Sequence, residues 1–407
     1  MRFPQFVRVF LLGITLFSQA ALSADDAPNA TAINADDGGG SAHKAVEETK
    51  IEIAPDIVTF PLPEPDGVPI AEPVSIVEPV KPSRIALFLP LKSATFGRAA
   101  DAIREGFLAA SQVPGAEPTL PIEIYDSGVD SKNLLVIYNR ILSENAKIVI
   151  GPMTRSDVTT IARSGMVTMP TLALNLPEGD GQSLPALFYS LNLSQEAEAR
   201  QLANIAFARG LRRAAVVSGP AALSKRMHAA FAAEFLQLGG TTTLEYVYRA
   251  EAKSLTEFRT ALKAQQVDVV FIATDATIAR KIRPYIRATL PTYATSQVFR
   301  SKNDAALNLD LKGLHFVDMP WLITPDHAAV MVYPQSKKSL TAELQRFYAL
   351  GIDAYRLAQR LIQSDIPPLE SIDGVSGRIS LTSGHWFVRE LLQATFDHTG
   401  AVIQQPP

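Results

Sequence analysis

The hydrophobic and polar positions of this chain form a regular pattern from residue 84 onward. Short runs that are apolar throughout, the first at 85–89, have the length and composition of strands buried on both faces. Each is followed by a segment with apolar residues at helical spacing, as with Ile103, Phe107 and Ala110. Such strands belong to a parallel sheet that helices cover on both sides. The pattern therefore predicts an α/β fold with doubly wound sheets.

Two successive blocks, 84–192 and 193–290, each hold about four strand–helix units, which predicts two similar lobes rather than one large sheet. Residues 291–407 have few strand-like runs and one long helical segment, and we expect them to complete the two lobes. The predicted strands are 85–89, 122–125, 147–150, 169–174, 186–191, 214–218, 242–248, 267–273, 293–298, 314–316 and 378–381. The predicted helices after the first are 132–143, 154–163, 194–209, 221–238, 255–265, 277–288 and 340–364.

The chain begins with a segment typical of a secretory signal peptide. Arg2 and Arg8 are basic, residues 9–17 are apolar, and residues 18–24 are mostly small. We therefore expect residues 1–24 to be a signal peptide that is cleaved near Ser23 or Ala24. The alternative is an uncleaved membrane anchor, although a membrane-spanning helix needs about 20 apolar residues and this run is shorter.

Residues 25–82 have the composition of a disordered linker. They contain nine prolines, twelve acidic residues and three lysines, which favours an extended backbone without a core. The whole chain carries a net charge of −3, which argues against nucleic-acid binding. The linker contributes −9 and the two arginines of residues 1–24 contribute +2, so residues 83–407 carry +4. The basic clusters at 209–213 and 280–287 are interpreted as solvated helix faces or, alternatively, as a docking patch for an acidic partner.

The sequence offers no residues for several kinds of chemistry. It contains no cysteine, so disulfides, thiolate metal sites, cysteine nucleophiles and a lipid anchor through cysteine are excluded. Its six histidines lack the spacing of a metal site, and no GxSxG, GxGxxG or Walker motif occurs. We therefore expect no metal, no cofactor and no catalytic residues, and the hydrolase alternative has no supporting motif.

Small polar residues follow many of the predicted strands. The carboxyl ends of parallel strands border the ligand cleft of such folds, so we expect these residues to line a cleft between the lobes. Helix starts at this edge favour anions. The alternative is that these side chains only cap helices, because Ser, Thr, Asp and Asn are the usual N-caps. The candidate ligand-binding residues are Ser93, Thr154, Arg155, Asn175, Ser218, Thr274, Asp275 and Gln297.

Longer segments carry a more specific signal. In order, they are RIALFLPL and AIREGFLAA within 84–110, IVIGPMTRSDV at 148–158, PTLALN at 170–175, YSLNLSQEAEARQLANIAFARG at 189–210, LHFVDMPWL at 314–322, RFYALGIDAYRLA at 346–358 and GVSGRISLTSGHWFVRELLQATFDHTG at 374–400. Together they resemble the C-terminal domain of the penicillin-binding protein activator family. Members of that family are outer-membrane lipoproteins that stimulate a bifunctional peptidoglycan synthase.

The resemblance implies a type I periplasmic binding protein fold, with two Rossmann-like lobes joined by three crossings. It places the crossings at 191–193, 291–298 and 374–381. Lobe I then consists of 83–192 and 298–374, and lobe II of 193–291 and 382–407. Family members typically carry a lipidated N-terminal cysteine and a helical-repeat domain, whereas this sequence has a signal peptide and a linker there. We therefore expect a periplasmic protein without a cysteine-linked lipid.

The function implied by the resemblance is that of a non-enzymatic periplasmic regulator. Its expected partner is a bifunctional penicillin-binding protein, which it binds and stimulates in cell-wall synthesis, and a small-molecule ligand in the cleft is a further expectation. The alternative is the solute-binding receptor of an ABC transporter for an amino acid or a peptide-like ligand, because both classes share the fold. In a receptor, Ser93, Thr154, Asn175 and Asp275 would contact the ligand. Met153 and Arg155, however, make the rim of lobe I bulkier than an amino-acid site needs.

Overall fold

The computed structural model describes residues 82–113, 120–128, 131–179, 183–301, 305–363, 371–400 and 402–404. All of them belong to one unit of the chain, Ile76–Pro407. The expected signal peptide and, apart from Pro82, the expected linker lie outside the described residues. Within the described ranges no helix combines the length and apolarity that a membrane span requires.

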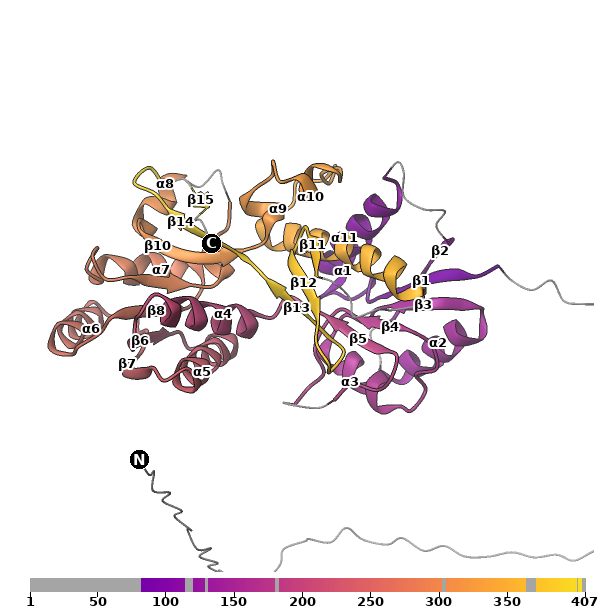
Figure 1. Ribbon diagram of the computed structural model, residues 1–407, viewed down its shortest axis with the longest axis horizontal. Helices are drawn as coiled ribbons and strands as arrows, with labels where there is room; N and C mark the ends of the chain where they lie inside the picture. The colour runs from indigo at the N-terminus through magenta and orange to yellow at the C-terminus, as the bar shows by residue number, and fades with distance from the viewer. Residues whose placement is uncertain are drawn as a thin grey trace, which may run out of the picture. The chain divides into compact units, whose positions relative to one another are not determined.

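The described residues form two sheets (Figure 1). The first has eight strands in the order β11-β12-β13-β5-β4-β3-β1-β2. Strands β1 to β5 pair in parallel with one another, and β13 pairs in parallel with β5. Strand β12 pairs antiparallel with both β13 and β11. The strands are β1 (Arg84–Leu89), β2 (Ile122–Asp126), β3 (Ala146–Ile150), β4 (Thr171–Ala173), β5 (Phe188–Leu191), β11 (Ile372–Gly374), β12 (Gly377–Leu381) and β13 (Trp386–Glu390).

Strand β1 shows why its sequence is apolar on both faces. Ile85 and Leu87 pack in the same core as Phe107 of α1 (Gly97–Ser111) and Leu350 of α11 (Ala342–Ile362). The alternate residues Ala86 and Phe88 pack in a second core formed with α2 (Ser131–Ser143) and α3 (Arg155–Arg163). Helices therefore cover both faces of this sheet, as the sequence pattern predicts.

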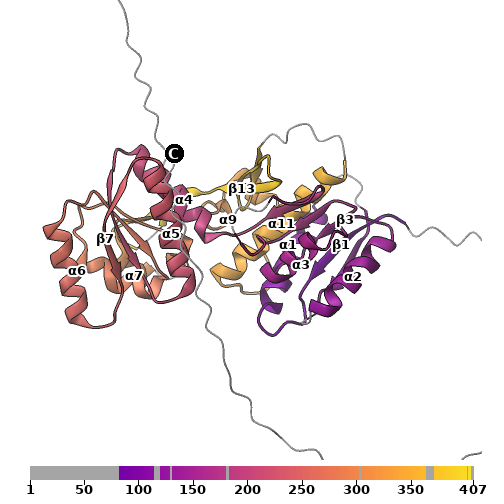
Figure 2. The same ribbon diagram turned by 90° about the horizontal axis from the view of Figure 1, so that it is seen from below.

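The second sheet has seven described strands in the order β15-β14-β10-β9-β8-β6-β7. Helices α4 and α5 pack against each other and against its central strands (Figure 2). The strands are β6 (Arg213–Ser218), β7 (Thr241–Val247), β8 (Val269–Ala273), β9 (Thr292–Ala294), β10 (Leu314–Asp318), β14 (Leu392–Phe396) and β15 (Val402–Gln404). The helices are α4 (Gln195–Ala208), α5 (Ala222–Gln237), α6 (Ala252–Ala264), α7 (Ala276–Ile282), α8 (Ala305–Asn308), α9 (Pro320–Ile323) and α10 (Ala328–Met331), with 3-10 turns η1 (Arg283–Tyr285), η2 (Ser296–Val298) and η4 (Leu309–Leu311).

The C-terminal part of the chain holds more strands than the sequence analysis predicted. Strands β11, β13, β14 and β15 were not predicted, because each is short or contains polar residues and none is a long apolar run. In β13, Phe387 is buried whereas Val388 and Glu390 are exposed. The helix predicted at 277–288 ends at Ile282, and a 3-10 turn with Pro284 follows it.

The strand order also differs from the predicted division into lobes. Strand β10 pairs with β9 in the second sheet, although 298–374 was expected in lobe I. Strand β13 pairs with β5 in the first sheet, although 382–407 was expected in lobe II. The chain therefore passes between the sheets after Leu191, after Asp318 and at Leu391, where β13 continues into β14 (Figure 1). We propose 83–191 with 342–390 as lobe I, and 195–318 with 392–404 as lobe II.

Helices α1 and α11 lie side by side in both views (Figures 1 and 2). A Cβ atom at Gly106 would overlap the carbonyl oxygen of Tyr348, and one at Gly351 would overlap that of Ile103. These glycines therefore allow the backbones to approach directly. They belong to the AIREGFLAA and RFYALGIDAYRLA segments, so both segments contribute to one helix contact in lobe I.

Candidate functional site

The three passages between the sheets meet at a group of polar side chains, buried except for the half-buried Arg389, which we call the hinge cluster. Its carboxylates lie on α4 and β10, its guanidinium groups lie on α11 and β13, and a serine of η2 joins them. The members are Glu198, Ser296, Asp318, Arg346 and Arg389.

Arg346 and Asp318 form the central ion pair of the hinge cluster. The Nε and Nη2 atoms of Arg346 donate to Oδ1 and Oδ2 of Asp318 at 3.1 and 2.6 Å. Arg346 Nη2 also donates to the backbone carbonyls of Ser296 and Phe299 at 2.9 and 3.0 Å. The two residues are only 7% and 1% exposed. A buried charge pair of this kind holds its geometry because loss of either partner leaves the other uncompensated.

Glu198 accepts three hydrogen bonds inside the cluster. The backbone N–H and the hydroxyl of Ser296 donate to it at 2.8 and 3.1 Å, and the side-chain amide of Gln195 donates at 3.0 Å. Burial and, as the next cause, the negative charge of Asp318 together raise the pKa of Glu198 to about 7. A carboxylate at the hinge therefore changes its charge near neutral pH.

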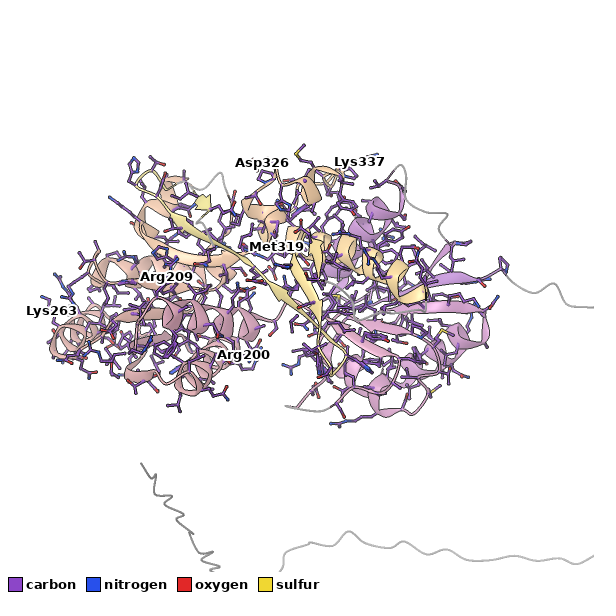
Figure 3. All side chains as sticks on the ribbon, viewed as in Figure 1. Arg200, Arg209, Lys263, Met319, Asp326 and Lys337 are labelled. Carbon is purple, nitrogen blue, oxygen red and sulfur yellow. The ribbon has the colours of Figure 1, made fainter. Side chains whose placement is uncertain are left out.

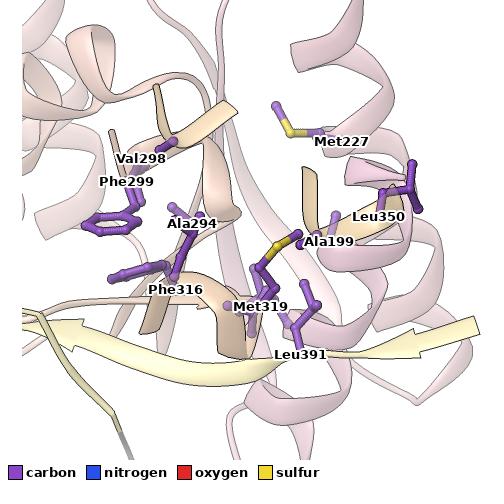
Figure 4. Packing of buried hydrophobic residues seen from close by; sticks show 14 of the residues in the cluster. Ala199, Met227, Ala294, Val298, Phe299, Phe316, Met319, Leu350 and Leu391 are labelled. Carbon is purple, nitrogen blue, oxygen red and sulfur yellow. The ribbon is translucent and has the colours of Figure 1, made fainter. Parts of the chain in front are cut away.

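The third passage is fixed by two side chains. Arg389 donates from Nε to the carbonyl of Asn192 at 2.8 Å and from Nη1 to that of Ser376 at 2.7 Å. The side chain of Gln201 exchanges two hydrogen bonds with the backbone of Leu391, at 2.8 and 3.1 Å. Apolar side chains pack next to these hydrogen bonds, and Figure 4 shows Met319 and Leu391 beside Ala199. The passages are therefore tied to one another by polar and apolar contacts.

A cavity of about 840 Å³ lies between elements of both lobes, and we call it the cleft cavity. It is bordered by the start of α1, the loops after β3 and β4, the start of α4, and parts of α5 and α11. Polar and apolar side chains share its wall. Its lining residues are Thr95, Phe96, Ala99, Met153, Arg155, Leu174, Asn175, Leu176, Leu193, Ser194, Gln195, Glu196, Arg200, Leu223, Arg226, Ala229, Ala230, Glu343 and Phe347.

Two further cavities adjoin this region. One, of about 690 Å³, shares Arg155 and Arg200 with the cleft cavity and is also lined by Trp386 and Val388. The other, of about 1010 Å³, shares Glu343 with the cleft cavity and extends along the start of α7 and the loop after η2. Polar and ionisable side chains thus lie along several separate spaces rather than around one pocket.

The predicted ligand-binding residues are divided among these spaces. Arg155 and Asn175 line the cleft cavity, whereas Asp275 and Gln297 line the cavity of about 1010 Å³. The other four predicted residues line none of the three cavities: Ser93, Thr154, Ser218 and Thr274. The structure therefore does not bring the predicted set together, and a ligand-binding role for these residues stays a prediction.

Several of these side chains accept hydrogen bonds from the backbone near helix starts, as in the capping interpretation of the sequence. Thr154 accepts from the backbone of Asp157 as the N-cap of α3, and Asp275 accepts from Thr277 and Ile278 as the N-cap of α7. Ser93 accepts from the backbone N–H of Phe96 at 3.1 Å. Ser218 and Thr274 are each 2% exposed.

Both polar atoms of the Asn175 side chain are hydrogen-bonded to the backbone at the cleft cavity. Its Nδ2 donates to the carbonyl of Met153 at 3.0 Å, and its Oδ1 accepts from the backbone of Leu176 at 2.9 Å.

The hinge cluster was not predicted from the sequence. Its members come from distant segments, and the crossings between the lobes were predicted at other positions. The one signal for it is the charge of Asp318 and Arg346 within apolar segments. Among the described residues, no group of three or more histidines and carboxylates is placed to hold a metal ion.

Comparison with known proteins shows which proteins this chain is similar to. The family model described as "LppC putative lipoprotein" matches residues 72–399. The Penicillin-binding protein activator LpoA of Vibrio antiquarius (strain Ex25) is 29% identical over 347 residues, covering 77% of this chain and 57% of that protein. LpoA of Photobacterium profundum is 23% identical over 361 residues, covering 81% and 58%. The chain thus spans somewhat more than half the length of these curated relatives.

Two solved structures illustrate the fold. A "putative branched-chain amino acid ABC transporter" from Chromobacterium violaceum ATCC 12472 is 34% identical, with a TM-score of 0.66, covering 77% of this chain and 99% of that one. The LpoA (YraM) C-domain from Haemophilus influenzae, described as a regulator of PBP1A, is 22% identical with a TM-score of 0.67, covering 79% and 100%. Together they confirm the predicted α/β fold of the periplasmic binding protein type.

Proposed function

This chain belongs to the LppC family, and from that premise we propose that it is a non-enzymatic regulator that binds and stimulates a peptidoglycan synthase. The observation that carries the proposal is the extent of the family match. It covers residues 72–399 and therefore includes nearly all of both sheets and the three passages between them. The predicted resemblance to the penicillin-binding protein activator family is confirmed by this match and by the curated relatives.

The expected partner is a bifunctional penicillin-binding protein. The relatives that share 29% and 23% identity with this chain are named activators of a penicillin-binding protein, which supports a regulatory role without catalysis. Because the chain spans little more than half of their length, the proposal concerns the part that corresponds to these two lobes. The activating surface is then carried by the lobes, not by the cleft residues alone.

The family and its relatives suggest a location in the cell envelope or the periplasm. We propose that residues 1–24 direct export and that the mature chain works in the periplasm. The sequence has no cysteine, so the proposal includes no lipid attached through that residue. N-terminal sequencing of the chain recovered from the periplasm tests this, with a new N-terminus near Asp25 as the expected result.

A second candidate function is that of a solute-binding receptor for an amino acid. It is favoured by the 34% identity to the Chromobacterium violaceum structure, which is described as an ABC transporter protein. A zwitterionic amino acid needs donors for its carboxylate and a carboxylate for its ammonium group around one small pocket. Here Asn175 and Asp275 line different cavities, and Asp275 is engaged as a helix N-cap. The regulator is therefore the better supported function.

Reconstitution separates the two functions. The mature chain is mixed with a bifunctional penicillin-binding protein of the same organism, and glycan polymerisation and peptide crosslinking are measured with lipid II as substrate. The regulator predicts binding to the synthase and a faster rate of at least one of the two reactions. A thermal unfolding screen with the proteinogenic amino acids runs in parallel. Absence of synthase binding, together with stabilisation by one amino acid, would replace the regulator by the receptor.

A further inference from the structure

The two basic clusters of the sequence, at 209–213 and 280–287, differ in what their side chains contact. Arg213 of the first cluster pairs with Asp268 at 2.7 Å between Nη2 and Oδ1. Arg209 (labelled in Figure 3) donates to a tyrosine hydroxyl and to a glutamine side-chain oxygen, both at 2.9 Å. The third arginine of this cluster donates to two backbone carbonyls and lies over a phenylalanine ring. The first cluster is therefore engaged within lobe II itself.

The second cluster belongs to a part of lobe II that we call the cationic face. It is formed by α7, η1, α8 and η4, which contact one another, and by the loops that follow η1 and η4 (Figure 1). Its described cations are Arg280, Lys281, Arg283, Arg287 and Lys312. None of them forms an ion pair with a described residue. Three of them are exposed and make no side-chain hydrogen bond within the described ranges either: Lys281, Arg287 and Lys312.

The carboxylates of the cationic face do not neutralise its five cations. Asp310 of η4 is exposed and forms no ion pair with a described residue. Asp397 borders the face, because the preceding carbonyl of Phe396 accepts from the backbone of Gly313 at 2.8 Å. Its Oδ1 accepts from the backbone N–H and the hydroxyl of Thr399, both at 2.7 Å. Helix α6 contacts η1 and adds three cations and one carboxylate, so the excess of positive charge extends beyond the face.

Arg283 differs from the other cations of the face because it is only 6% exposed. Its Nη1 donates to the carbonyl of Ile286 at 3.1 Å, and its Nε is buried without a hydrogen-bond partner among the described residues. Burial lowers the pKa of Arg283. The buried Arg346 of the hinge cluster, in contrast, is compensated by Asp318. A buried guanidinium group without a carboxylate is unfavourable, so an anionic group placed against this face is stabilising.

Unpaired hydrogen-bond donors also gather beneath the face. Arg280 donates from Nη2 to Oδ1 of Asn308 at 3.4 Å, which joins α7 to α8. Its Nε and the Nδ2 atom of Asn308 are buried without an acceptor among the described residues. Together with Nε of Arg283, three donors therefore lack an acceptor in this part of lobe II. A carboxylate offers only acceptors, which is the type of group that this face lacks.

Two exposed leucines belong to the same elements. Leu307 of α8 is 54% exposed and Leu309 of η4 is 48% exposed. A single exposed leucine is common, but apolar side chains next to unpaired cations have the composition of a protein–protein contact, with an apolar centre and a charged rim. An anionic bilayer is a poorer partner, because its headgroups repel Asp310 and Asp397. A protein can supply cations that pair with both carboxylates.

From these observations we infer that the cationic face of lobe II docks the synthase through an acidic patch of the synthase that has an apolar centre. This inference rests on the proposed function and names the surface that makes the contact. Carboxylates of the synthase pair with the three exposed cations of the face, and its apolar side chains cover Leu307 and Leu309. The exposed cations line none of the three cavities, so docking is separate from the space between the lobes.

Charge reversal on the mature full chain tests the inference. The affinity for a bifunctional penicillin-binding protein of the same organism is measured by interferometry at about 150 mM salt. The triple variant Lys281→Glu/Arg287→Glu/Lys312→Glu is expected to bind about a hundredfold more weakly, because three attractive contacts become repulsive. Binding of the wild type should also weaken as salt is raised, and association should slow, because opposite charges steer the two proteins together.

A second triple variant is the matched control. Lys147→Glu/Arg163→Glu/Lys225→Glu also replaces two lysines and one arginine that are exposed and have no partner among the described residues. It makes the same change in net charge at other positions on the two lobes and should bind like the wild type. Thermal unfolding of both triple variants should give the Tm of the wild type within a few degrees, since no described contact is lost.

The apolar centre is tested separately. Leu307→Ser/Leu309→Ser should weaken binding by about tenfold without changing its salt dependence, because only apolar contacts are lost. Leu236→Ser, on α5, is the control, since Leu236 is 67% exposed and lies outside the cationic face. It should bind like the wild type.

The outcomes separate this inference from the proposed function. If the wild type binds the synthase and the first triple variant binds equally well, the docking surface is elsewhere and the inference is wrong, while the regulator stands. Equal losses in the two triple variants would show a general effect of net charge and would also overturn the inference. Absence of binding by the wild type would remove the regulator and the docking surface together.

A parallel measurement with vesicles of phosphatidylglycerol and phosphatidylethanolamine tests the membrane as the partner. We expect no difference between the wild type and the triple variants in vesicle binding. If the first triple variant loses vesicle binding and keeps its affinity for the synthase, the cationic face contacts a lipid surface and the inference is wrong.

Discussion

Replacing Glu198 by glutamine tests whether the hinge cluster is a pH-dependent element of this fold. Glu198 is 4% exposed, and burial followed by the charge of Asp318 raises its pKa from 4.5 to about 7. The folded state thus binds the proton more tightly than the unfolded state. The stability that this proton contributes is fully present below pH 4.5 and is lost as the pH rises through about 7. Above pH 7 the charged carboxylate costs about 3 kcal/mol relative to the neutral form.

The local hydrogen bonds can accommodate the substitution. The Oε1 atom of Gln195 is buried without a partner, whereas its amide nitrogen donates to Glu198. If the Gln195 amide rotates by half a turn, Oε1 accepts from the new glutamine amide. The N–H of Ser296 still donates to the remaining oxygen at position 198. The variant therefore removes the charge while it keeps the network.

The assay is thermal and urea unfolding of the wild type and Glu198→Gln between pH 4 and pH 8.5. We expect similar stabilities near pH 4 and a variant that is more stable above pH 7, by about 3 kcal/mol or roughly 6–12 °C in Tm. Burial lowers the pKa of His315, which changes stability in the opposite direction, but this effect cancels in the difference between the proteins. Glu257→Gln, on exposed α6, is the matched control. Parallel stability curves for wild type and Glu198→Gln would refute the reasoning.

Two further predictions concern the packing of lobe I and its hinge. Arg346→Met should lower the free energy of unfolding by about 3–5 kcal/mol because it leaves Asp318 buried and unpaired. The double variant Asp318→Leu/Arg346→Met should recover part of this loss. Equal losses in the two variants would contradict the ion-pair argument. Gly106→Ala and Gly351→Ala should each lower it by about 1–3 kcal/mol, because the new methyl group meets the backbone of the facing helix. Thermal unfolding measures all four, and Arg360→Ala on the exposed face of α11 should leave Tm unchanged.

Much of the fold could be predicted from local patterns. Buried parallel strands are apolar runs, so the first eight strands of the series from β1 to β8 were each expected close to their observed positions. Strands β11 and β13 to β15 were not, because their short segments contain polar residues instead of a long apolar run, and a strand's partner cannot be read from its own residues. The sheet that β10 joins was not predicted correctly for a related reason. Which sheet a strand joins depends on which strand edges are still unpaired, and this is not a property of the strand's own residues.

For the candidate site, too, local sequence predicted some features and not others. Residue type and position predicted that Thr154 and Asp275 stand at helix starts, and both the capping and the ligand-binding interpretations followed from that. Only the tertiary structure decides which space each residue faces. It places Asn175 and Asp275 at different cavities, because each loop follows a strand of a different sheet.

The sequence by itself determined the α/β class, the two-lobed organisation and, through its longer segments, the family. These follow from the spacing of apolar residues and from residue identity, which are properties of single segments. The hinge cluster, in contrast, was decided by the tertiary structure. Glu198, Asp318, Arg346 and Arg389 meet only because three passages between the sheets converge. Burial and charge balance arise between segments, and therefore no segment contains them.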